Sequence, residues 1–202
     1  MGHYTGPKGR INRRLGFMIF ENNGARKALE RRETPPGMHV KRGRVSDYGR
    51  ALAEKQKIKY YYGLSERQLR RLYAEASRQP GNTGEALLIL CESRLDNAIR
   101  LAGFTKTRPQ ARQGIAHGHF QINGRKNDIP ATLVRPNDLV HVKPRPEIQA
   151  LYHSILSDGG STPPIWLGVD LEHLAVRVLQ RPTMDDVTLR VNIGSVIELL
   201  SR

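Results

Sequence analysis

Hydrophobic residues recur at helical spacing through much of the chain. Leu69, Leu72, Tyr73 and Ala76 fall at positions i, i+3, i+4 and i+7, so they share one face of a helix. Residues 65–68, with the sequence Ser-Glu-Arg-Gln, form a capping box directly before this run. The pattern therefore predicts an amphipathic helix that begins at this cap and has a polar opposite face.

The same reasoning predicts helices on both sides of this one. Ser46 or Asp47 can cap a helix that extends to about Tyr60. Thr107 can cap another helix further along the chain. Residues 93–102 have a buried stripe at helical spacing, which leaves Arg94 on the expected outer face. Apolar residues within 193–200 keep the same spacing, so we expect a terminal helix that packs back onto a domain.

The hydrophobic period changes from helical to strand-like after the helix that Thr107 is predicted to cap. Phe120 and Ile122 alternate with polar residues up to the Asn-Gly pair at 123–124, which is the strongest short hairpin signal. Val140 and Val142 alternate in the same way. The pattern predicts a hairpin and a closing strand.

The first 46 residues lack such periodicity. They contain few apolar residues and many Gly, Pro and Arg, and the Pro-Pro-Gly sequence at 35–37 is incompatible with a regular helix or a central strand. We expect an extended basic arm with short turns that becomes ordered against a binding partner. Short apolar stretches within 15–20 argue against complete disorder.

These elements predict an α+β protein of four segments. Residues 1–45 form the extended basic arm, and residues 46–91 form a helical N-terminal domain. Residues 92–155 form a compact domain of two helices and a hairpin with a small antiparallel sheet. Residues 156–202 form a C-terminal extension that completes the sheet and packs a terminal helix on the N-terminal domain.

The chain is strongly basic, and its charge is unevenly distributed. It has 202 residues, with 33 Lys and Arg against 19 Asp and Glu, a formal net charge of +14. The net charge is +12 over residues 1–80, +5 over 81–145 and −3 over 146–202. Such an excess favours a polyanion as partner, since each cation placed on a phosphate releases a condensed counterion.

Several classes of function have no support in the sequence. No apolar run approaches the roughly 20 residues that a membrane-spanning helix needs. The single cysteine, Cys91, excludes a disulfide framework within the chain, and no phosphate-binding glycine loop or nucleophile elbow occurs. His117 and His119 have no neighbouring ligand to complete a metal site. We therefore expect a protein that is not an enzyme and has no cofactor and no metal.

Arginines gather on the polar side of the helix that begins at the capping box. Arg67, Arg71 and Arg78 fall together opposite its apolar face, with too few acids nearby to neutralise them. A second basic cluster surrounds the helix N-terminus at Thr107, where N–H groups and the helix dipole favour a phosphate. Few aromatic residues lie among these charges, which favours the backbone and shape of a folded RNA over stacked single-stranded bases.

Four of these motifs resemble a known RNA-binding domain. Glu-Ser-Arg-Leu-Asp-Asn at 92–97, Thr-Arg-Pro-Gln-Ala-Arg-Gln at 107–113, His-Gly-His at 117–119 and Ile-Asn-Gly at 122–124 resemble the S4 domain. The flanking sequences, among them Tyr-Thr-Gly-Pro-Lys at 4–8, narrow the resemblance to the bacterial small-subunit ribosomal protein S4 family. The likeness extends over nearly the whole chain.

The resemblance implies a cytoplasmic ribosomal protein that binds small-subunit (16S) rRNA and nucleates assembly of the subunit body. It also implies contact with ribosomal protein S5, an influence on translational accuracy and a place near the channel through which mRNA enters. No homo-oligomer and no membrane is expected. Many family members hold a zinc through cysteines in the arm; Gly9 and Asn12 stand at two of those positions here, so the resemblance implies the zinc-free form.

Charge, helix position and resemblance together select one set of residues for RNA contact. It comprises Arg10, Arg13, Arg14, Arg31, Arg32, Arg50, Lys55, Lys57, Arg67, Arg71, Arg78, Arg94, Lys106, Thr107, Arg108, Gln110, Arg112, His117, His119, Asn123 and Arg125.

Two other functions stay open at this point. An RNA-modifying enzyme could use the same domain as an anchor, but residues 146–202 are too few for a catalytic domain. A free RNA chaperone or a regulator of translation could have the same basic surface, and its association with ribosomes would distinguish it.

Overall fold

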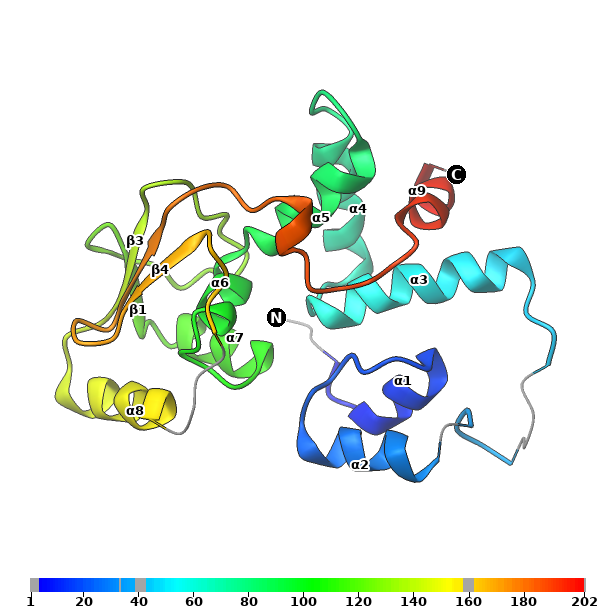
Figure 1. The fold of residues 1–202 in the computed structure, drawn as a ribbon, viewed down its shortest axis with the longest axis horizontal. Coiled ribbons are helices and arrows are strands. Elements are labelled where there is room, and N and C mark those ends of the chain that lie inside the picture. The colour runs from blue at the N-terminus through cyan, green and yellow to red at the C-terminus, as the bar shows by residue number, and fades with distance from the viewer. Residues whose placement is uncertain (1–3, 33, 39–42, 158–161, 202) are drawn as a thin grey trace. The chain divides into compact units, whose positions relative to one another are not determined.

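The computed structural model describes residues 4–32, 34–38, 43–157 and 162–201, and it divides into two compact units (Figure 1). The first unit comprises Met1–Leu87 and Leu189–Arg202, and the second comprises Leu88–Thr188. The first is helical where it is described, and the second combines helices with a sheet. The α+β class predicted from the sequence is confirmed.

The first unit is built from short helices with clear local signals. They are α1 (Lys8–Leu15), α2 (Asn23–Arg31), α3 (Asp47–Tyr61), α4 (Glu66–Ala76), the first half of α5 (Thr83–Glu92) and α9 (Ile193–Ser201). Ser46 caps α3, its Oγ accepting from the Gly49 N–H. Ser65 and Gln68 form both bonds of the predicted capping box on α4. The starts predicted for these two helices are confirmed.

The C-terminal helix α9 packs against α3 within this unit. The Asn192 N–H, just before α9, donates to a Glu54 carboxylate oxygen on α3 at 3.0 Å. Val196 and Leu200 are the buried residues of α9, in agreement with the helical spacing predicted at 193–200. The packing brings residues separated by more than a hundred positions in the chain into direct contact.

The segment expected to be extended contains two helices in the structure. Both α1 and α2 form there, with Ile11 and Ala25 buried on their inner faces. Gly16 ends α1 in the left-handed conformation, with φ of 62°. The sequence expectation was wrong for these stretches, because each helix is too short for a periodic pattern and is stabilised by packing against the other.

The second unit places helices against one antiparallel sheet. Its elements are α6 (Leu95–Leu101), α7 (Arg108–Ala116), β1 (Phe120–Ile122), β2 (Arg125–Lys126), β3 (Leu139–Val142), α8 (Pro146–Ser157), β4 (Leu167–Asp170), β5 (Ala175–Val178) and the 3₁₀ turn η1 (Met184–Asp186). The strand order is β2-β1-β3-β5-β4. β3 pairs directly with β5, with Val140 opposite Val176, although α8 and β4 lie between these strands in the sequence.

A single hydrophobic cluster holds this second unit together. It joins buried residues of α6, α7, the sheet and α8, including Phe104, Phe120, Tyr152 and the fully buried Trp166. Cys91, near the end of α5, is also completely buried. The cluster fixes the positions of the α6–α7 pair and of the hairpin, which carry many of the predicted RNA-binding residues.

The predicted hairpin is confirmed at β1 and β2. Asn123 and Gly124 connect the strands with φ values of 49° and 79°, the positive pair that a tight hairpin turn requires. The Asn123 side chain also accepts from the Leu139 N–H and donates to Asp138. These bonds attach the turn to the start of β3.

Candidate nucleic-acid interface

The residues predicted to bind RNA differ in their exposure to solvent. The exposed ones are Arg10, Arg14, Arg31, Arg32, Arg50, Arg67, Arg71, Arg78, Lys106, Gln110, His117, Asn123 and Arg125. The partly buried ones are Arg13, Lys57, Thr107 and His119. The buried ones are Lys55, Arg94, Arg108 and Arg112. A phosphate can reach the first group without any rearrangement of the protein, so that group defines the candidate surface.

The outer face of α4 carries a dense row of cations. Arg67, Arg70 and Arg71 are all exposed, while Leu69 and Leu72 are buried on the inner side. Sequence reasoning missed Arg70, because it counted only residues directly opposite the apolar stripe and not their i+3 neighbour. Arg70 lies 3.8 Å from the Glu66 carboxylate and keeps 64% of its side chain exposed. The row can neutralise several phosphates at once.

Arg78 does not belong to this helical face. α4 ends at Ala76 and Ser77 is its C-cap, so Arg78 follows the helix in an exposed turn. The prediction that it aligns with Arg67 on one helix was wrong, because the helix stops before the Pro80-Gly81 break.

The basic residues of α1 and α2 have two different roles. Arg10 and Arg14 on α1 are exposed, as is Arg31 at the end of α2. Arg13 instead donates through Nε to the Thr34 carbonyl at 3.0 Å and through Nη2 to the following carbonyl of residue 35 at 3.2 Å. The guanidinium of Arg13 therefore fastens the chain after α2 and is less available to RNA than those of its neighbours.

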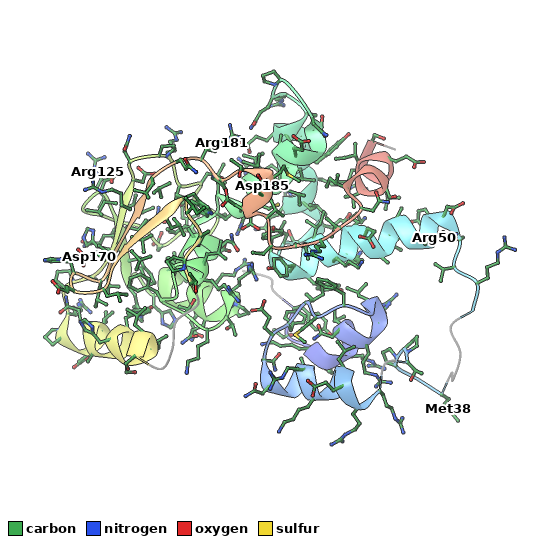
Figure 2. All side chains as sticks on the ribbon, viewed as in Figure 1. Met38, Arg50, Arg125, Asp170, Arg181 and Asp185 are labelled. Atoms are coloured by element: carbon green, nitrogen blue, oxygen red, sulfur yellow. The ribbon has the colours of Figure 1, made fainter. Side chains whose placement is uncertain are left out.

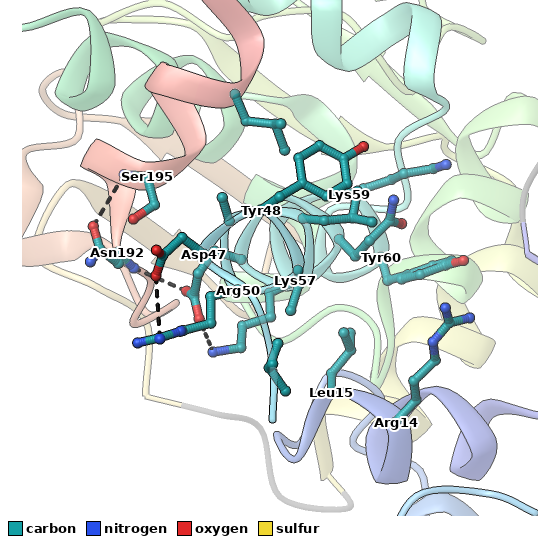
Figure 3. Close-up of a pocket in the computed structure, with 18 of the residues that line it drawn as sticks. Arg14, Leu15, Asp47, Tyr48, Arg50, Lys57, Lys59, Tyr60, Asn192 and Ser195 are labelled. Carbon is teal, nitrogen blue, oxygen red and sulfur yellow. Dashed lines mark hydrogen bonds and ion pairs between the residues drawn. The ribbon is translucent and has the colours of Figure 1, made fainter. Parts of the chain in front are cut away.

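A groove of about 1150 Å³ lies in the first unit, lined by residues of α1, α3 and α9 (Figure 3). Arg14, Arg50, Lys57 and Lys59 contribute positive charge to its lining. Arg50 is ion-paired with Asp47 at 3.2 Å on the exposed start of α3. The lining also includes Asp47, Glu54 and Glu198, so the groove has mixed charge.

Two predicted lysines of α3 are held by neighbouring carboxylates. Lys55 is buried and its Nζ lies 2.7 Å from Glu66. Lys57 Nζ lies 2.6 Å from Glu54 and also approaches the Phe17 ring, at 5.6 Å from its centroid. These contacts tie α3 to α4 and to the segment after α1, so both lysines serve the fold of the first unit.

The Lys55 contact changes the acidity of its partner. Burial alone would raise the pKa of Glu66, but the hydrogen bond and charge of Lys55, with the charges of Lys59 and Arg70, outweigh it and hold that pKa below its ordinary value. Glu66 therefore stays ionised, and it connects α3 to the cationic face of α4.

Arg94 and Arg112 lie inside the second unit around one carboxylate. Arg94 donates through Nε and Nη2 to the two Asp96 oxygens at 3.0 and 2.7 Å, and all but 2–3% of both side chains is covered. Arg112 Nε lies 3.8 Å from Asp96. The expectation that Arg94 faces outward was wrong, because α6 begins at Leu95 and Arg94 is its N-cap rather than a residue of its outer face.

Arg108 belongs to an adjoining buried group. Its Nε donates to the Asn97 side-chain oxygen at 2.8 Å, and the Asn97 amide donates to the Glu92 carboxylate and main-chain oxygen. Burial lowers the pKa of Arg112, opposed by the Asp96 charge. These bonded arginines hold α5, α6 and α7 together and are not available to RNA in this arrangement.

The N-terminus of α7 is capped by its own side chains. Thr107 Oγ accepts from the Gln110 N–H at 3.4 Å, and Gln110 Oε1 accepts from the Lys106 N–H at 3.0 Å. Pro109 has no N–H to donate. Of the N–H groups expected to receive a phosphate, that of Gln110 is already bonded and Pro109 has none. Exposed Lys106 is then the main cation of this helix end.

The two histidines after α7 also differ from one another. His117 is exposed, whereas His119 Nδ1 lies 3.2 Å from the Tyr152 hydroxyl. Burial, and next the charge of His117, lower the pKa of His119. Burial raises the pKa of Tyr152 to about 12. His119 is thus partly buried against Tyr152, and His117 is the one on the surface.

The β1–β2 hairpin adds a basic edge beside His117. Arg125 and Lys126 are exposed, and Figure 2 shows Arg125 projecting away from the ribbon. A Cβ built on Gly118 would lie 2.8 Å from Lys126 Cε, so the lysine crosses the turn between α7 and β1. Lys126, which the residue set chosen from the sequence omits, is therefore a further exposed cation beside the turn that follows His117.

The described residues hold no group of three or more His, Cys, Asp or Glu that could bind a metal ion. Among them, no helix is both long and apolar enough to cross a membrane.

Two family models match the chain in adjoining stretches. Residues 3–92 match the "Ribosomal protein S4/S9 N-terminal domain", and residues 93–140 match the "S4 domain". Together the two models cover the capped helices of the first unit, the buried arginine network and the hairpin.

Full-length relatives carry a single common name. The small ribosomal subunit protein uS4 of Rhodopirellula baltica is 52% identical over 202 residues, which is 100% of both chains. The proteins of the same name from Rubrobacter xylanophilus and Roseiflexus castenholzii are 43% and 41% identical over 204 and 208 residues, again at 100% coverage of both.

Proposed function

The chain belongs to the uS4 family of small ribosomal subunit proteins, and we propose that it is a structural, non-catalytic component of the small subunit that binds its ribosomal RNA in the cytoplasm. The full-length match to uS4 relatives carries the proposal. The exposed cations of α1, α4 and the hairpin supply the chemistry that such binding needs.

The proposed RNA surface is narrower than the residue set chosen from the sequence. It consists of Arg10, Arg14, Arg31, Arg32, Arg50, Arg67, Arg70, Arg71 and Arg78 in the first unit, and Lys106, His117, Arg125 and Lys126 in the second. Scarce exposed aromatic side chains on these elements favour phosphate and shape recognition. The acid-leaning residues 146–202 face protein or solvent in this proposal.

The finer role follows from family membership. We propose that the chain binds a multi-helix junction in the 5′ domain of 16S rRNA early in assembly and so nucleates the subunit body. Contact with ribosomal protein S5, an influence on translational accuracy and a position near incoming mRNA are parts of the same proposal. Residues 1–45, 46–91 and 92–155 would supply the RNA contacts, and residues 156–202 would support them.

Association with ribosomes in high salt tests the proposal. Tagged full-length chain should copurify with small subunits after a high-salt wash, because an assembled protein dissociates far more slowly than one held only by surface charge. Complete absence from assembled subunits, with binding only to free RNA, would exclude the ribosomal role and leave a free RNA chaperone.

A further inference from the structure

Asn12 is a fully buried polar residue in the middle of the basic helix α1. Its Nδ2 donates to the Phe20 carbonyl at 3.0 Å. Its Oδ1 accepts from the N–H groups of Ile19 and Phe20 at 3.1 and 3.0 Å. One side chain therefore bonds to both polar groups of Phe20 and fixes the segment after α1 to the helix.

Helix α2 and the chain that follows it also contact α1. A Cβ placed on Gly9 would lie 2.7 Å from the Ala28 Cβ, so α1 and α2 approach closely at this point. Arg13, on the same helix, bonds the carbonyl of Thr34. The side chains left exposed on α1 include Arg10 and Arg14, which belong to the proposed RNA surface.

The chemistry of this position requires an amide. A buried peptide group needs both an acceptor for its N–H and a donor for its C=O, and the asparagine side chain supplies both at once. Helices of 8 and 9 residues, the lengths of α1 and α2, are marginal without tertiary contacts. Removal of the Asn12 amide therefore releases the 17–20 segment and loosens α1.

We propose that Asn12 is a positioning residue for RNA binding, which holds the 17–20 segment on α1 and so presents Arg10 and Arg14 in one orientation. It does not itself contact RNA. The predicted effect on RNA affinity rests on the proposed RNA-binding function, whereas the role of Asn12 in holding the 17–20 segment does not. A surface ordered beforehand loses less conformational entropy when RNA binds.

Hydrogen exchange of the free full-length protein tests the structural part. The Phe20 amide should exchange at least tenfold faster in Asn12→Ala than in the original chain, because its acceptor is gone. Asn12→Asp keeps the acceptor and should retain part of the protection. Asn23→Ala, an exposed asparagine of α2, is the matched control and should change nothing at Phe20. Equal exchange in Asn12→Ala and the original chain would overturn the inference.

RNA binding tests the consequence, with a transcript of the 5′ domain of 16S rRNA titrated at several salt concentrations. Asn12→Ala should bind about three- to tenfold more weakly, and its salt slope should fall by about one to two, as expected for loss of the Arg10 and Arg14 phosphate contacts. Unchanged affinity, or weaker binding with an unchanged slope, would overturn the proposal. If the original chain itself fails to bind the transcript, the proposed function fails, while the exchange result still decides how Asn12 acts.

Discussion

The arginines of α4 and those around α6 and α7 have the same side chain and opposite surroundings. Arg67 and Arg71 extend from α4 into solvent. Arg94 and Arg112 surround the buried carboxylate of Asp96, which is only 2% exposed. The charges of the first pair are accessible to a binding partner, whereas those of the second pair are neutralised by a carboxylate inside the fold. Arginine content alone therefore overstates the RNA-binding surface of this chain.

The difference teaches which energies act at each site. A buried guanidinium is costly to desolvate and tolerable only with a bonded carboxylate, so loss of that carboxylate affects folding. An exposed guanidinium contributes little to stability, but each phosphate that it contacts adds to the salt dependence of binding. Substitutions in the two regions should consequently separate stability from RNA affinity.

The largest expected effect comes from Asp96→Ala. The substitution leaves Arg94 and Arg112 buried without their shared carboxylate, so the second unit should lose about 3–5 kcal/mol of stability. Urea unfolding followed by fluorescence of Trp166, the single tryptophan and a buried core residue of that unit, measures the loss.

Asp128→Ala is the matched control for this experiment. Asp128 is 57% exposed and lies 3.9 Å from Lys126, so its removal should change stability by less than about 1 kcal/mol. A similarly small effect of Asp96→Ala would mean that the buried network does not hold the second unit together.

The double substitution Arg67→Glu with Arg71→Glu should act on binding instead. Affinity for 16S rRNA should fall on the order of tenfold to a hundredfold, and the salt slope should decrease by about 2, since two phosphate contacts are lost. Stability should stay within about 1 kcal/mol, because both side chains are exposed. Filter binding across a salt series provides the measurement.

Arg177→Glu, at the one exposed position of the otherwise buried strand β5 and outside the proposed surface, controls for a change in net charge. If it reduces the salt slope as much as the double variant does, the effect is one of bulk charge and α4 is not a specific RNA-binding face.

The smallest expected effect concerns Glu66, which connects the buried Lys55 to the α4 surface. Its pKa lies below the ordinary value of 4.5 in the folded protein, so its stabilising contribution is present above that pH and is lost as the pH falls through the lowered pKa. Glu66→Gln should cost up to about 1 kcal/mol at neutral pH, a modest amount because 37% of the side chain is exposed.

Urea denaturation followed by far-UV circular dichroism at several pH values tests this. The stability difference between Glu66→Gln and the original chain should shrink as the pH falls below 4.5. A difference that is constant with pH would show that the carboxylate charge is irrelevant there.

Local signals account for what the sequence could predict. The cap at Ser65 and the Asn123-Gly124 turn are each specified by residues within a few positions, so α4 and the hairpin could be placed correctly. The exposure of Arg67 followed from the same local periodicity. The strand β5 was not predicted from the sequence, and its pairing with β3 joins segments that α8 and β4 separate along the chain.

Burial of the arginines depended on contacts that periodicity does not report. Extending the 93–102 helix by two residues was enough to place Arg94 on the wrong side, because an N-cap side chain does not follow the helical wheel. Arg112 was misplaced because its partner, Asp96, is on another helix. The helical arm was missed for a related reason, since the contact between Gly9 and Ala28 is tertiary.

The buried thiol of Cys91 can report local opening of the structure through its rate of reaction with a thiol reagent. Burial raises its pKa to about 12, so the folded protein offers a thiol reagent neither access nor a thiolate. Modification must wait until this end of α5 opens. Its labelling rate therefore reports how often the part of α5 that belongs to the second unit opens.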